Sequence, residues 1–258
     1  MKNRCHPITL ILLFCSGLLA QRDIEYPGEA YFGGGIGYTP TFLMLDVAKA
    51  FPFNTGTDAT TQELLGASGL NFTPDDVDAL GSMLVLHGAE GFGNITGSWR
   101  IGAYVGLGSN SITRVDTNAG TDATVDLKLT LMNGSASVEY VIPLFSNLEI
   151  SAGSLFGFSR AIIQFASTSV APDWEGQFNG TDTSNTMAVL SGTFFSFQPY
   201  MAIKLQFLDR AGLRMSAGYQ LGTLAANRWA VNDFQKIVAP SDGNFNALAV
   251  RVMLYLGI

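Results

Sequence analysis

Side chains that could carry acid–base, nucleophilic or metal chemistry are few in this sequence. Cys5, Cys15 and His6 lie within the first twenty residues, and His87 is the one other histidine. A Ser-His-acid triad would therefore have to use His87, yet Glu90, three residues away, points to the opposite face of an extended strand. A single histidine with scattered carboxylates also forms no recognisable metal site. We expect no enzyme, no cofactor and no metal, and keep a lipid hydrolase that uses His87 as an alternative.

Eight charged residues lie at positions that alternate with apolar ones in extended stretches. They are Arg100, Asp126, Lys128, Glu139, Glu149, Lys204, Arg214 and Arg251. Alternate residues of a strand point to one face, so all eight are predicted to share the polar face of a sheet that encloses a lumen. Five cations and three anions enclosed together would be expected to pair, because an unpaired buried charge is costly. We interpret the set as a polar plug, with a gated or very narrow ion path as the alternative.

The elements that must position these charges are clearest over residues 123–166. From Val125 to Leu131 apolar and polar residues alternate, and from Met132 onward the apolar positions shift by one residue. This alternation predicts two long antiparallel strands joined near residues 143–147. We interpret the shift at Leu131–Met132 as a β-bulge, which adds one residue to a strand without inverting its faces.

The same alternation recurs along the chain and predicts eight strands. Short connections of about five residues alternate with long ones of about 14 to 43 residues, which is typical of a closed transmembrane barrel with its long loops outside. The first long connection, residues 39–81, carries helix signals after Thr39 and at Thr73, and Pro40 should end the strand pairing because it has no N–H. The predicted fold class is all-β: an eight-stranded antiparallel transmembrane β-barrel with long extracellular loops and some helix in the first loop.

Periodicity alone does not say which face of the strands points outward. A soluble lipocalin-like barrel would show the same alternation with its apolar face inward. The polar face here is rich in Gly, Ser, Thr and Gln, where a water-exposed surface usually carries more Lys and Glu. We therefore place the apolar face toward lipid and the polar face toward the lumen, with His87 in the lumen or at its rim. Leu127, Ile150, Ile203 and Val252 packed together at the centre would contradict this prediction.

Composition and the first residues indicate an exported protein. Charged residues make up 14% of the chain, well below the roughly 25% of soluble domains. A basic start and a short apolar run up to Ala20 predict a signal peptide over residues 1–20, because the run is too short to span a bilayer. Residues 21–258 are then a single barrel domain without cysteine. This domain carries 12 basic and 21 acidic residues, a net charge of −9, which argues against a nucleic-acid partner.

The first and last predicted strands carry a family resemblance. The first reads Gly33-Gly34-Gly35-Ile36-Gly37-Tyr38, and the last is an apolar alternating strand that ends at Ile258. In an exported, cysteine-free chain, these features resemble the small eight-stranded bacterial outer-membrane proteins, over residues 27–258. The resemblance implies location in the outer membrane, insertion by the barrel-assembly machinery, contact with outer-membrane lipid or lipopolysaccharide, and a monomer. It implies no single function, because such proteins include adhesins, structural anchors, lipid-modifying enzymes and small-solute pores.

The predicted loops are acidic and contain two tryptophans, Trp174 and Trp229. Tryptophan is favoured at binding hot spots, so these residues are candidates for contact with an extracellular protein. We expect an outer-membrane barrel with a structural or surface-interaction role. The alternatives are a narrow pore for small or apolar solutes, an outer-membrane lipid-modifying enzyme and a soluble lipocalin-like binder.

Overall fold

The computed structural model describes residues 34–50, 80, 83–96, 98–116, 123–145, 147–168, 185–208, 210–239 and 241–257. The chain divides into two compact units between Phe32 and Gly33, and every described residue belongs to the second unit. The predicted signal peptide, the helix signal at Thr73 and the loop residue Trp174 lie outside the described residues and stay predictions. Among the described residues, no helix is both long and apolar enough to cross a membrane.

Long antiparallel strands make up nearly all of the described chain. The wall consists of β1 (Gly35–Tyr38), β2 (Thr41–Leu45), β3 (Met83–Thr96), β4 (Trp99–Asp116), β5 (Ala123–Phe145), β6 (Leu148–Thr168), β7 (Asn185–Leu208), β8 (Ala211–Leu224) and β12 (Ala247–Gly257). Shorter elements lie in the connections: α2 (Val47–Ala50), η1 (Ala226–Arg228), β9 (Trp229–Val231), β10 (Gln235–Ile237) and β11 (Gly243–Asn244).

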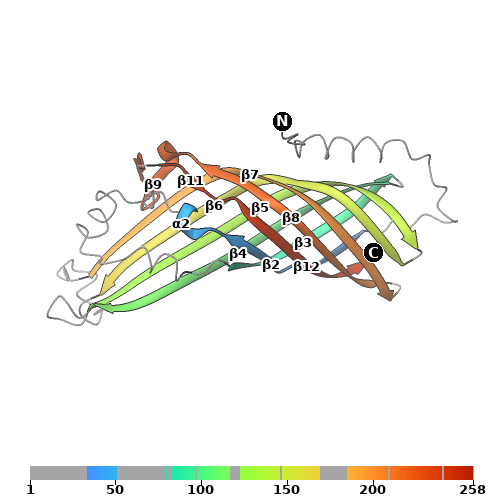
Figure 1. Ribbon diagram of the computed structural model, residues 1–258, viewed down its shortest axis with the longest axis horizontal. Coiled ribbons are helices and arrows are strands. Elements are labelled where there is room, and N and C mark those ends of the chain that lie inside the picture. Colours follow the sequence, from blue (N-terminus) through green and yellow to red (C-terminus); the bar gives the residue numbers. More distant parts are fainter. Residues whose placement is uncertain are drawn as a thin grey trace, which may run out of the picture. The chain divides into compact units, whose positions relative to one another are not determined.

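The wall closes into a ring because the first and last strands pair. On one side, β12 pairs with β1, where Gly35 lies opposite Gly257, and with β2, where Leu45 lies opposite Ala247. On the other side, β1 and β2 both pair with β3, so they form one interrupted wall strand. The ring therefore has eight members (Figure 1) and confirms the predicted eight-stranded antiparallel barrel.

Pro40 interrupts the first wall strand without ending its pairing, contrary to the prediction. Its carbonyl accepts a hydrogen bond from the amide of Val252, and the pairing with β12 resumes in β2. The helix predicted to follow Thr39 is wrong over this stretch, because β2 continues the period-2 alternation and buries every second residue. In the described part of the first connection, only Val47–Ala50 is helical.

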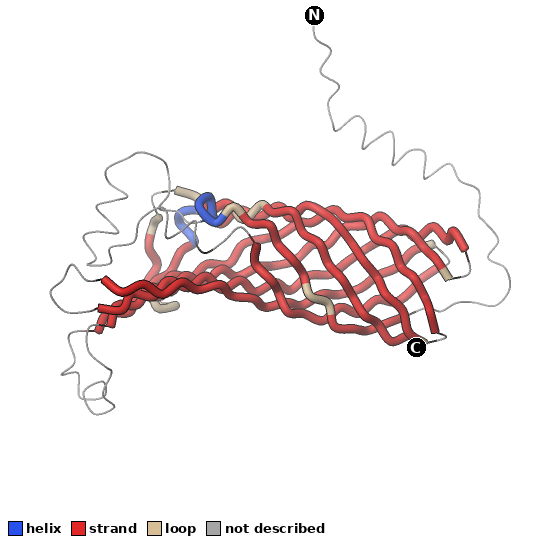
Figure 2. The backbone as a smooth tube through the Cα atoms, turned by 60° about the horizontal axis from the view of Figure 1, so that its bottom comes forward, coloured by secondary structure: helices blue, strands red, loops and turns tan. Residues whose placement is uncertain are grey.

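Short turns join the strands at one end of the barrel, and the long connections lie at the other. The turns follow β3, β5 and β7, and β12 ends beside them, where the amide of Gly257 donates to the carbonyl of Arg210. The elements α2, β9 and β11 gather at the opposite end (Figure 1). We call the two parts the turn half and the loop half. The strands β5, β6 and β7, with 23, 21 and 24 residues, run through both halves (Figure 1). Figure 2 shows the long strands of the wall reaching past the helical segments at the loop end.

The apolar face of the wall changes sides between the two halves. In β5, Leu131 is buried in the lumen while Met132 is exposed on the outer surface. The ladders of β5 with β4 and with β6 pass through this point without a register shift. The β-bulge predicted at Leu131–Met132 is therefore wrong. The backbone keeps its alternation, and the apolar residues move from the lumen face in the loop half to the outer face in the turn half.

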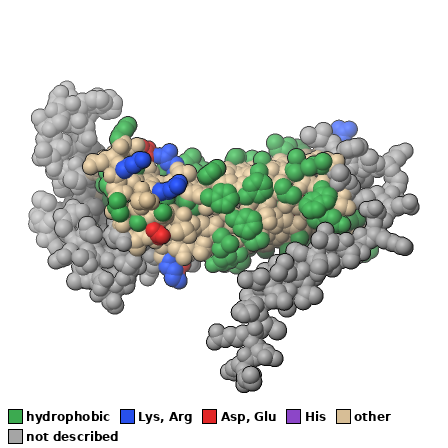
Figure 3. Space-filling model, turned by 90° about the horizontal axis from the view of Figure 1, so that it is seen from above, with side chains coloured by type: hydrophobic (Ala, Val, Ile, Leu, Met, Phe, Trp, Pro, Cys, Tyr) green, Lys and Arg blue, Asp and Glu red, His purple; other side chains and the backbone are tan. Residues whose placement is uncertain are grey.

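The outer surface of the turn half is an apolar belt. Its exposed residues include Trp99, Ile101, Val105, Phe156, Phe158, Phe195, Phe197, Met201, Ile203, Leu205, Met215, Leu221, Leu254 and Leu256. On the face seen in Figure 3, hydrophobic side chains spread over the middle of the wall and charged ones gather toward the loop end. The prediction that the apolar side faces outward is correct for the turn half, where Ile203 is exposed, and wrong for the loop half, where Leu127 is buried.

The interior of the loop half is an apolar core. Its largest members are Leu43, Leu45, Leu84, Leu86, Leu127, Leu129, Leu131, Ile163, Phe165, Phe194, Trp229 and Phe245. Trp229 and Phe245 come from the connection between β8 and β12, which folds into the barrel mouth. There β9 pairs with the part of β7 that lies in the loop half, and the rings of Phe194 and Phe245 stack with their centroids 4.7 Å apart.

Candidate functional site

In the lumen of the turn half, seven charged side chains of the described residues contact one another. They are Glu90, Arg100, Glu139, Glu149, Lys204, Arg214 and Arg251. Each of the seven comes from a different strand of the wall. Six of them belong to the eight charged residues that the alternation placed on the polar face. We call the seven residues the lumen charge network.

Strand register brings several members of the network together. Arg100 lies opposite Glu139, and Lys204 lies between Glu149 and Arg214. All five occupy the inward phase of their strands, so they meet inside the barrel. The position opposite Glu139 on β6 is glycine, Gly153, where a Cβ would lie 2.6 Å from the Cβ of Glu139. A larger residue there would press on the Cβ and backbone of Glu139, so glycine allows the close approach of the two strands at this position.

The network begins near the turns with Lys204. Its Nζ lies 3.3 Å from Glu149, and the same carboxylate accepts a hydrogen bond of 2.8 Å from Nη2 of Arg100. Nη1 of Arg100 lies 3.6 Å from Oε1 of Glu139. That separation is too long for a hydrogen bond, but the two opposite charges still compensate each other. Cations and carboxylates therefore alternate along this part of the network.

The alternation continues toward the middle of the barrel. Oε2 of Glu139 accepts hydrogen bonds from Nη2 of Arg214 at 2.8 Å and from the hydroxyl of Ser151 at 2.7 Å. Arg214 also donates through Nη1 to Glu90. Oε2 of Glu90 lies 3.4 Å from Nη1 of Arg251, where the network ends. Each inner member thus touches opposite charges on two sides, which offsets the cost of burial.

Aromatic rings line the network and contact its cations. The guanidinium carbon of Arg100 lies 4.7 Å from the ring centre of Phe92, and that of Arg251 lies 4.5 Å from the ring centre of Tyr200. Nζ of Lys204 lies 5.5 Å from the ring centre of Tyr255. Such cation–π contacts are attractive and strengthen when water is excluded. They hold the cations in place within the lumen.

Asp126 and Lys128, the other two predicted members, do not join the network. Lys128 is exposed on the outer wall, and Asp126 accepts a hydrogen bond from the Thr113 hydroxyl there. Their predicted lumen position is wrong because it depended on the β-bulge at Leu131–Met132. Without a bulge, they keep the outward phase of Met132 and lie in the loop half, where the polar face is the outer one.

Glu90 is the network member that the sequence reasoning missed. It is buried and contacts both Arg214 and Arg251. A signal was present, because Glu90 lies at the same phase of β3 as Leu84 and Leu86, and both leucines are buried in the lumen. Those leucines belong to the loop half, however, where the inward face is apolar. The same inward face becomes polar in the turn half, which explains why it carries two leucines and then a carboxylate.

His87 lies on the outer wall, and its predicted position in the lumen or at its rim is wrong. It is exposed, and its Nδ1 hydrogen-bonds the hydroxyl of Tyr38 at 2.5 Å. Glu90 is inside the barrel, so the wall separates the two residues. The structure therefore does not bring together the histidine and carboxylate that a triad would use.

The prediction that Trp229 is an exposed contact residue in a loop is wrong. Trp229 is 1% exposed and belongs to the apolar core of the loop half. The residue begins β9, which pairs with β7 at Gly192. This long-range pairing places the indole inside the barrel mouth. The polar residues around Trp229 gave no sign of this burial, because it depends on a strand distant in the chain.

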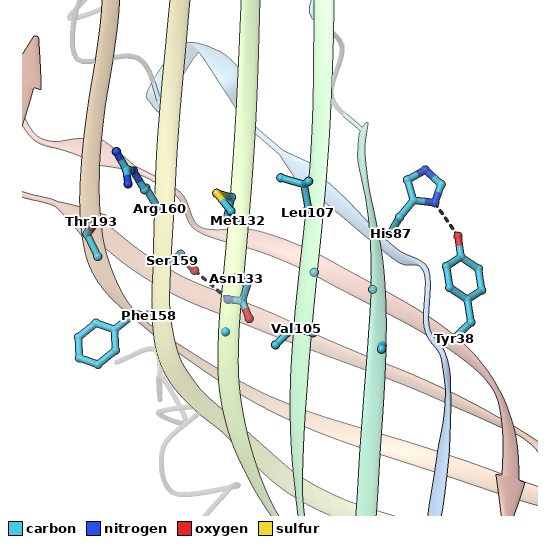
Figure 4. Close-up of a pocket in the computed structure, with 14 residues that line it drawn as sticks. Tyr38, His87, Val105, Leu107, Met132, Asn133, Phe158, Ser159, Arg160 and Thr193 are labelled. Carbon is cyan, nitrogen blue, oxygen red and sulfur yellow. Dashed lines mark hydrogen bonds between the residues drawn. The ribbon is translucent and has the colours of Figure 1, made fainter. Parts of the chain in front are cut away.

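A shallow groove of about 720 Å³ lies on the outer wall where the apolar belt meets the polar loop half. Its floor follows one row of paired residues across β3, β4 and β5: Ala89, Val105 and Gly134. A Cβ at Gly134 would meet nothing within 4 Å, so the floor is open there. Tyr38 and Phe158 continue the row on either side as large walls (Figure 4). We call this feature the outer-wall groove.

The loop-side edge of the groove is polar. The next row of the wall runs from His87 through Leu107 and Met132 to Arg160 (Figure 4). A guanidinium and an imidazole therefore stand at the two ends of this edge, above an apolar floor. Such an arrangement suits an amphiphile with apolar chains and a hydrogen-bonding head.

The hairpin between β9 and β10 is fastened to the wall beside this edge. Asp233 accepts hydrogen bonds from Ser191 at 2.5 Å and from Arg160 at 2.6 Å. Those two contacts hold the pKa of Asp233 below its ordinary value of 3.8. Asn232 and Asp233 have φ angles of 50° and 63°, which short polar side chains tolerate better than most.

The geometry defines the class of protein. The ring is closed, its turn half is apolar outside, and charges lie inside that half. In hydrocarbon, a β-structure satisfies its backbone groups only when it closes on itself, and short turns opposite long loops are typical of bacterial outer-membrane barrels. The chain is an eight-stranded β-barrel of the bacterial outer membrane.

Comparisons with known proteins give fold-level likenesses at low sequence identity. No protein-family model matches the sequence, and no curated protein matches it. Ail, the attachment invasion locus protein of Yersinia pestis, is 10% identical with a TM-score of 0.38, over 86% of this chain and 96% of Ail. An outer membrane channel from Pseudomonas putida F1 is 9% identical with a TM-score of 0.25, over 92% of this chain and 100% of the channel.

Proposed function

We propose that this protein has a structural or surface-interaction role in the outer membrane and a lumen that is closed to solutes. One observation carries the proposal: the barrel is filled at two successive heights by different chemistry. The lumen charge network occupies the turn half, and the apolar core occupies the loop half. A solute that crossed the barrel would have to displace both.

The two fillings exclude different solutes. In the apolar core, Leu127, Leu129 and Phe245 are each at most 1% exposed, and an ion entering such surroundings loses its hydration without compensation. In the charge network, Arg214 bridges Glu90 and Glu139 across the barrel, so an apolar solute would have to break ion pairs. Neither class of solute finds a continuous path.

Planar-bilayer recording tests the closed lumen. The purified protein should show no stepwise conductance above the bare bilayer, and the variants Arg100→Gln and Arg251→Gln should be compared with it. Arg210→Gln is the matched control, because Arg210 is exposed at a turn outside the network. Stepwise conductance in the natural protein that changes in R100Q and R251Q but not in R210Q would establish a narrow pore and overturn the proposal.

The outer-wall groove supports lipid as the contacted partner. It lies on the outward face of the membrane belt, and its polar edge is toward the long loops, which face outside in this class. We assign it to the acyl chains of an outer-leaflet lipid or lipopolysaccharide, with Arg160 and His87 beside the headgroup. The proposal also includes a monomer inserted by the barrel-assembly machinery and an extracellular protein partner at the loop end.

Filling the groove tests the lipid assignment. Gly134→Trp should reduce the lipid retained through detergent exchange, measured by native mass spectrometry. Ala217→Trp is the matched control, because Ala217 is an exposed outward residue of β8 outside the groove. Equal retention by both variants would remove the groove from the proposal and leave the closed lumen untouched.

No catalytic step is part of this proposal. The hydrogen-bond partner of His87 is Tyr38, and the barrel wall stands between His87 and the nearby Glu90. A lipid hydrolase would need a nucleophile, a base and an orienting acid on one side of the wall. An esterase activity that is lost in His87→Ala would overturn this part of the proposal.

A further inference from the structure

The lumen charge network has an excess of one cation. Among the described residues it contains four cations and three carboxylates in strict alternation, so a cation stands at each end. Lys204 is the end near the turns, and Arg251 is the end in the middle of the barrel. A buried positive charge with one partner is unfavourable unless another group compensates it.

Arg251 is the less satisfied end of the network. It is 1% exposed, and its one ion pair within the described part of the chain, from Nη1 to Glu90, is long at 3.4 Å. Its Nε and Nη2 are buried and have no hydrogen-bond partner among the described residues. A guanidinium carries only donors, so each of these two nitrogens calls for an acceptor.

Two further buried donors lie in the same part of the barrel: Tyr200, whose ring contacts Arg251, and Thr39, two residues from Thr41, which is paired with Arg251. The ring centre of Tyr200 lies 4.5 Å from its guanidinium carbon, and within the described part of the chain the Tyr200 hydroxyl has no hydrogen-bond partner. The Thr39 hydroxyl is fully buried with no partner among the same residues. Thr39 precedes Pro40, whose carbonyl bonds the amide next to Arg251, at Val252. Buried donors from β7, from β12 and from the link between β1 and β2 thus occur in this part of the lumen.

We propose that Arg251, Tyr200 and Thr39 form a binding site for one small monovalent anion of the halide class inside the barrel. The excess of one positive charge sets the charge of the ligand. The donor-only character of the guanidinium requires an acceptor, and the rings of Tyr200 and Tyr104 flank the guanidinium carbon at 4.5 and 5.8 Å, which favours a small ion over a bulky one. The site does not depend on whether the lumen conducts.

Bromide is the probe for this site, because it scatters anomalously and substitutes for chloride. Crystals of the full chain grown in sodium bromide should show an anomalous peak at hydrogen-bond distance from Nε or Nη2 of Arg251. The peak should vanish in Arg251→Met and persist in Lys204→Met, which removes the cation at the other end of the network. An absent peak in the natural protein, or equal loss in both variants, would overturn the site.

A solution measurement keeps the test independent of crystals and of R251M folding. The unfolding midpoint of the natural protein, followed by its heat-dependent gel migration, should rise when chloride replaces gluconate at constant ionic strength. Tyr200→Phe and Thr39→Val keep the charge network and each remove one donor, so each should weaken the apparent chloride affinity by about tenfold. Identical chloride dependence in the natural protein and both variants would contradict the proposal.

Discussion

Leu131 is 0% exposed inside the barrel, and Met132, its neighbour in β5, is 42% exposed on the outer wall. This pair marks the height at which the apolar residues change sides. Toward the turns the outer wall is apolar and the lumen is polar, as a barrel in lipid requires. Toward the loops the lumen is apolar and β4 and β5 carry hydroxyl and charged residues outside, as in a barrel in water. The protein combines both designs in one continuous ladder.

The inversion makes opposite predictions for neighbouring residues of β5. Leu127→Ala should lower the free energy of unfolding by about 2–5 kcal/mol, because it opens a cavity in the apolar core. Thr130→Ala, three residues further along β5 and on the outer wall, should change the free energy of unfolding by less than about 0.5 kcal/mol. Urea unfolding in detergent micelles measures both. Equal effects would mean that the loop half has no apolar interior.

Removing one partner of an ion pair in the charge network should lower the free energy of unfolding more than removing both partners together. Glu139→Gln removes one of the two carboxylates that compensate Arg100 and Arg214, which keep Glu149 and Glu90. The network is then left with four cations and two carboxylates, and we expect a loss of about 3–5 kcal/mol in the free energy of unfolding. The double variant Glu139→Gln with Arg100→Gln restores the original net charge of the network, so its loss should be smaller than the sum of the two single losses. Additive losses in a double-mutant cycle would show that the two side chains act independently.

Trp229 should behave as a buried residue. In a variant with Trp99→Phe and Trp174→Phe, the emission of Trp229 should be blue-shifted and poorly quenched by acrylamide, because the indole is 1% exposed. Trp229→Ala should lower the free energy of unfolding by about 3–5 kcal/mol. Emission at the wavelength of water-exposed tryptophan would restore the surface-contact prediction for this residue.

The hairpin held by Asp233 should loosen in acid. Hydrogen bonds from Ser191 and Arg160 lower the pKa of Asp233 in the folded protein, so the folded state binds this proton less tightly than the unfolded chain does. The stabilisation is therefore complete well above pH 3.8 and is lost as the pH falls through the lowered pKa. The amide of Asn232, which donates to the carbonyl of Val189, reports the attachment.

Hydrogen exchange of that amide, corrected for the intrinsic pH dependence of exchange, should show protection at pH 6 that falls below about pH 4. Asp233→Asn should show the low protection at both pH values, because it lacks the carboxylate. A hairpin equally protected in the natural protein and in D233N would show that the pairing of β9 with β7 suffices.

Alternation in the sequence determined the strands, their number and the alternation of short and long connections. It also identified six of the seven members of the charge network, because residues two apart in a strand share a face whatever surrounds them. In the turn half, one assumption was enough to place these residues in the lumen, namely that the apolar face of each strand points outward.

The tertiary structure decided which side of the wall each face occupies at each height. A shift of phase within one strand can mean a bulge or an inversion, and only the register with neighbouring strands distinguishes them. That register placed Asp126 and Lys128 outside and Glu90 inside. Pairing of β9 with β7, which are distant in sequence, likewise buried Trp229. Sidedness follows from what surrounds each part of the barrel, and a strand read by itself does not contain that information.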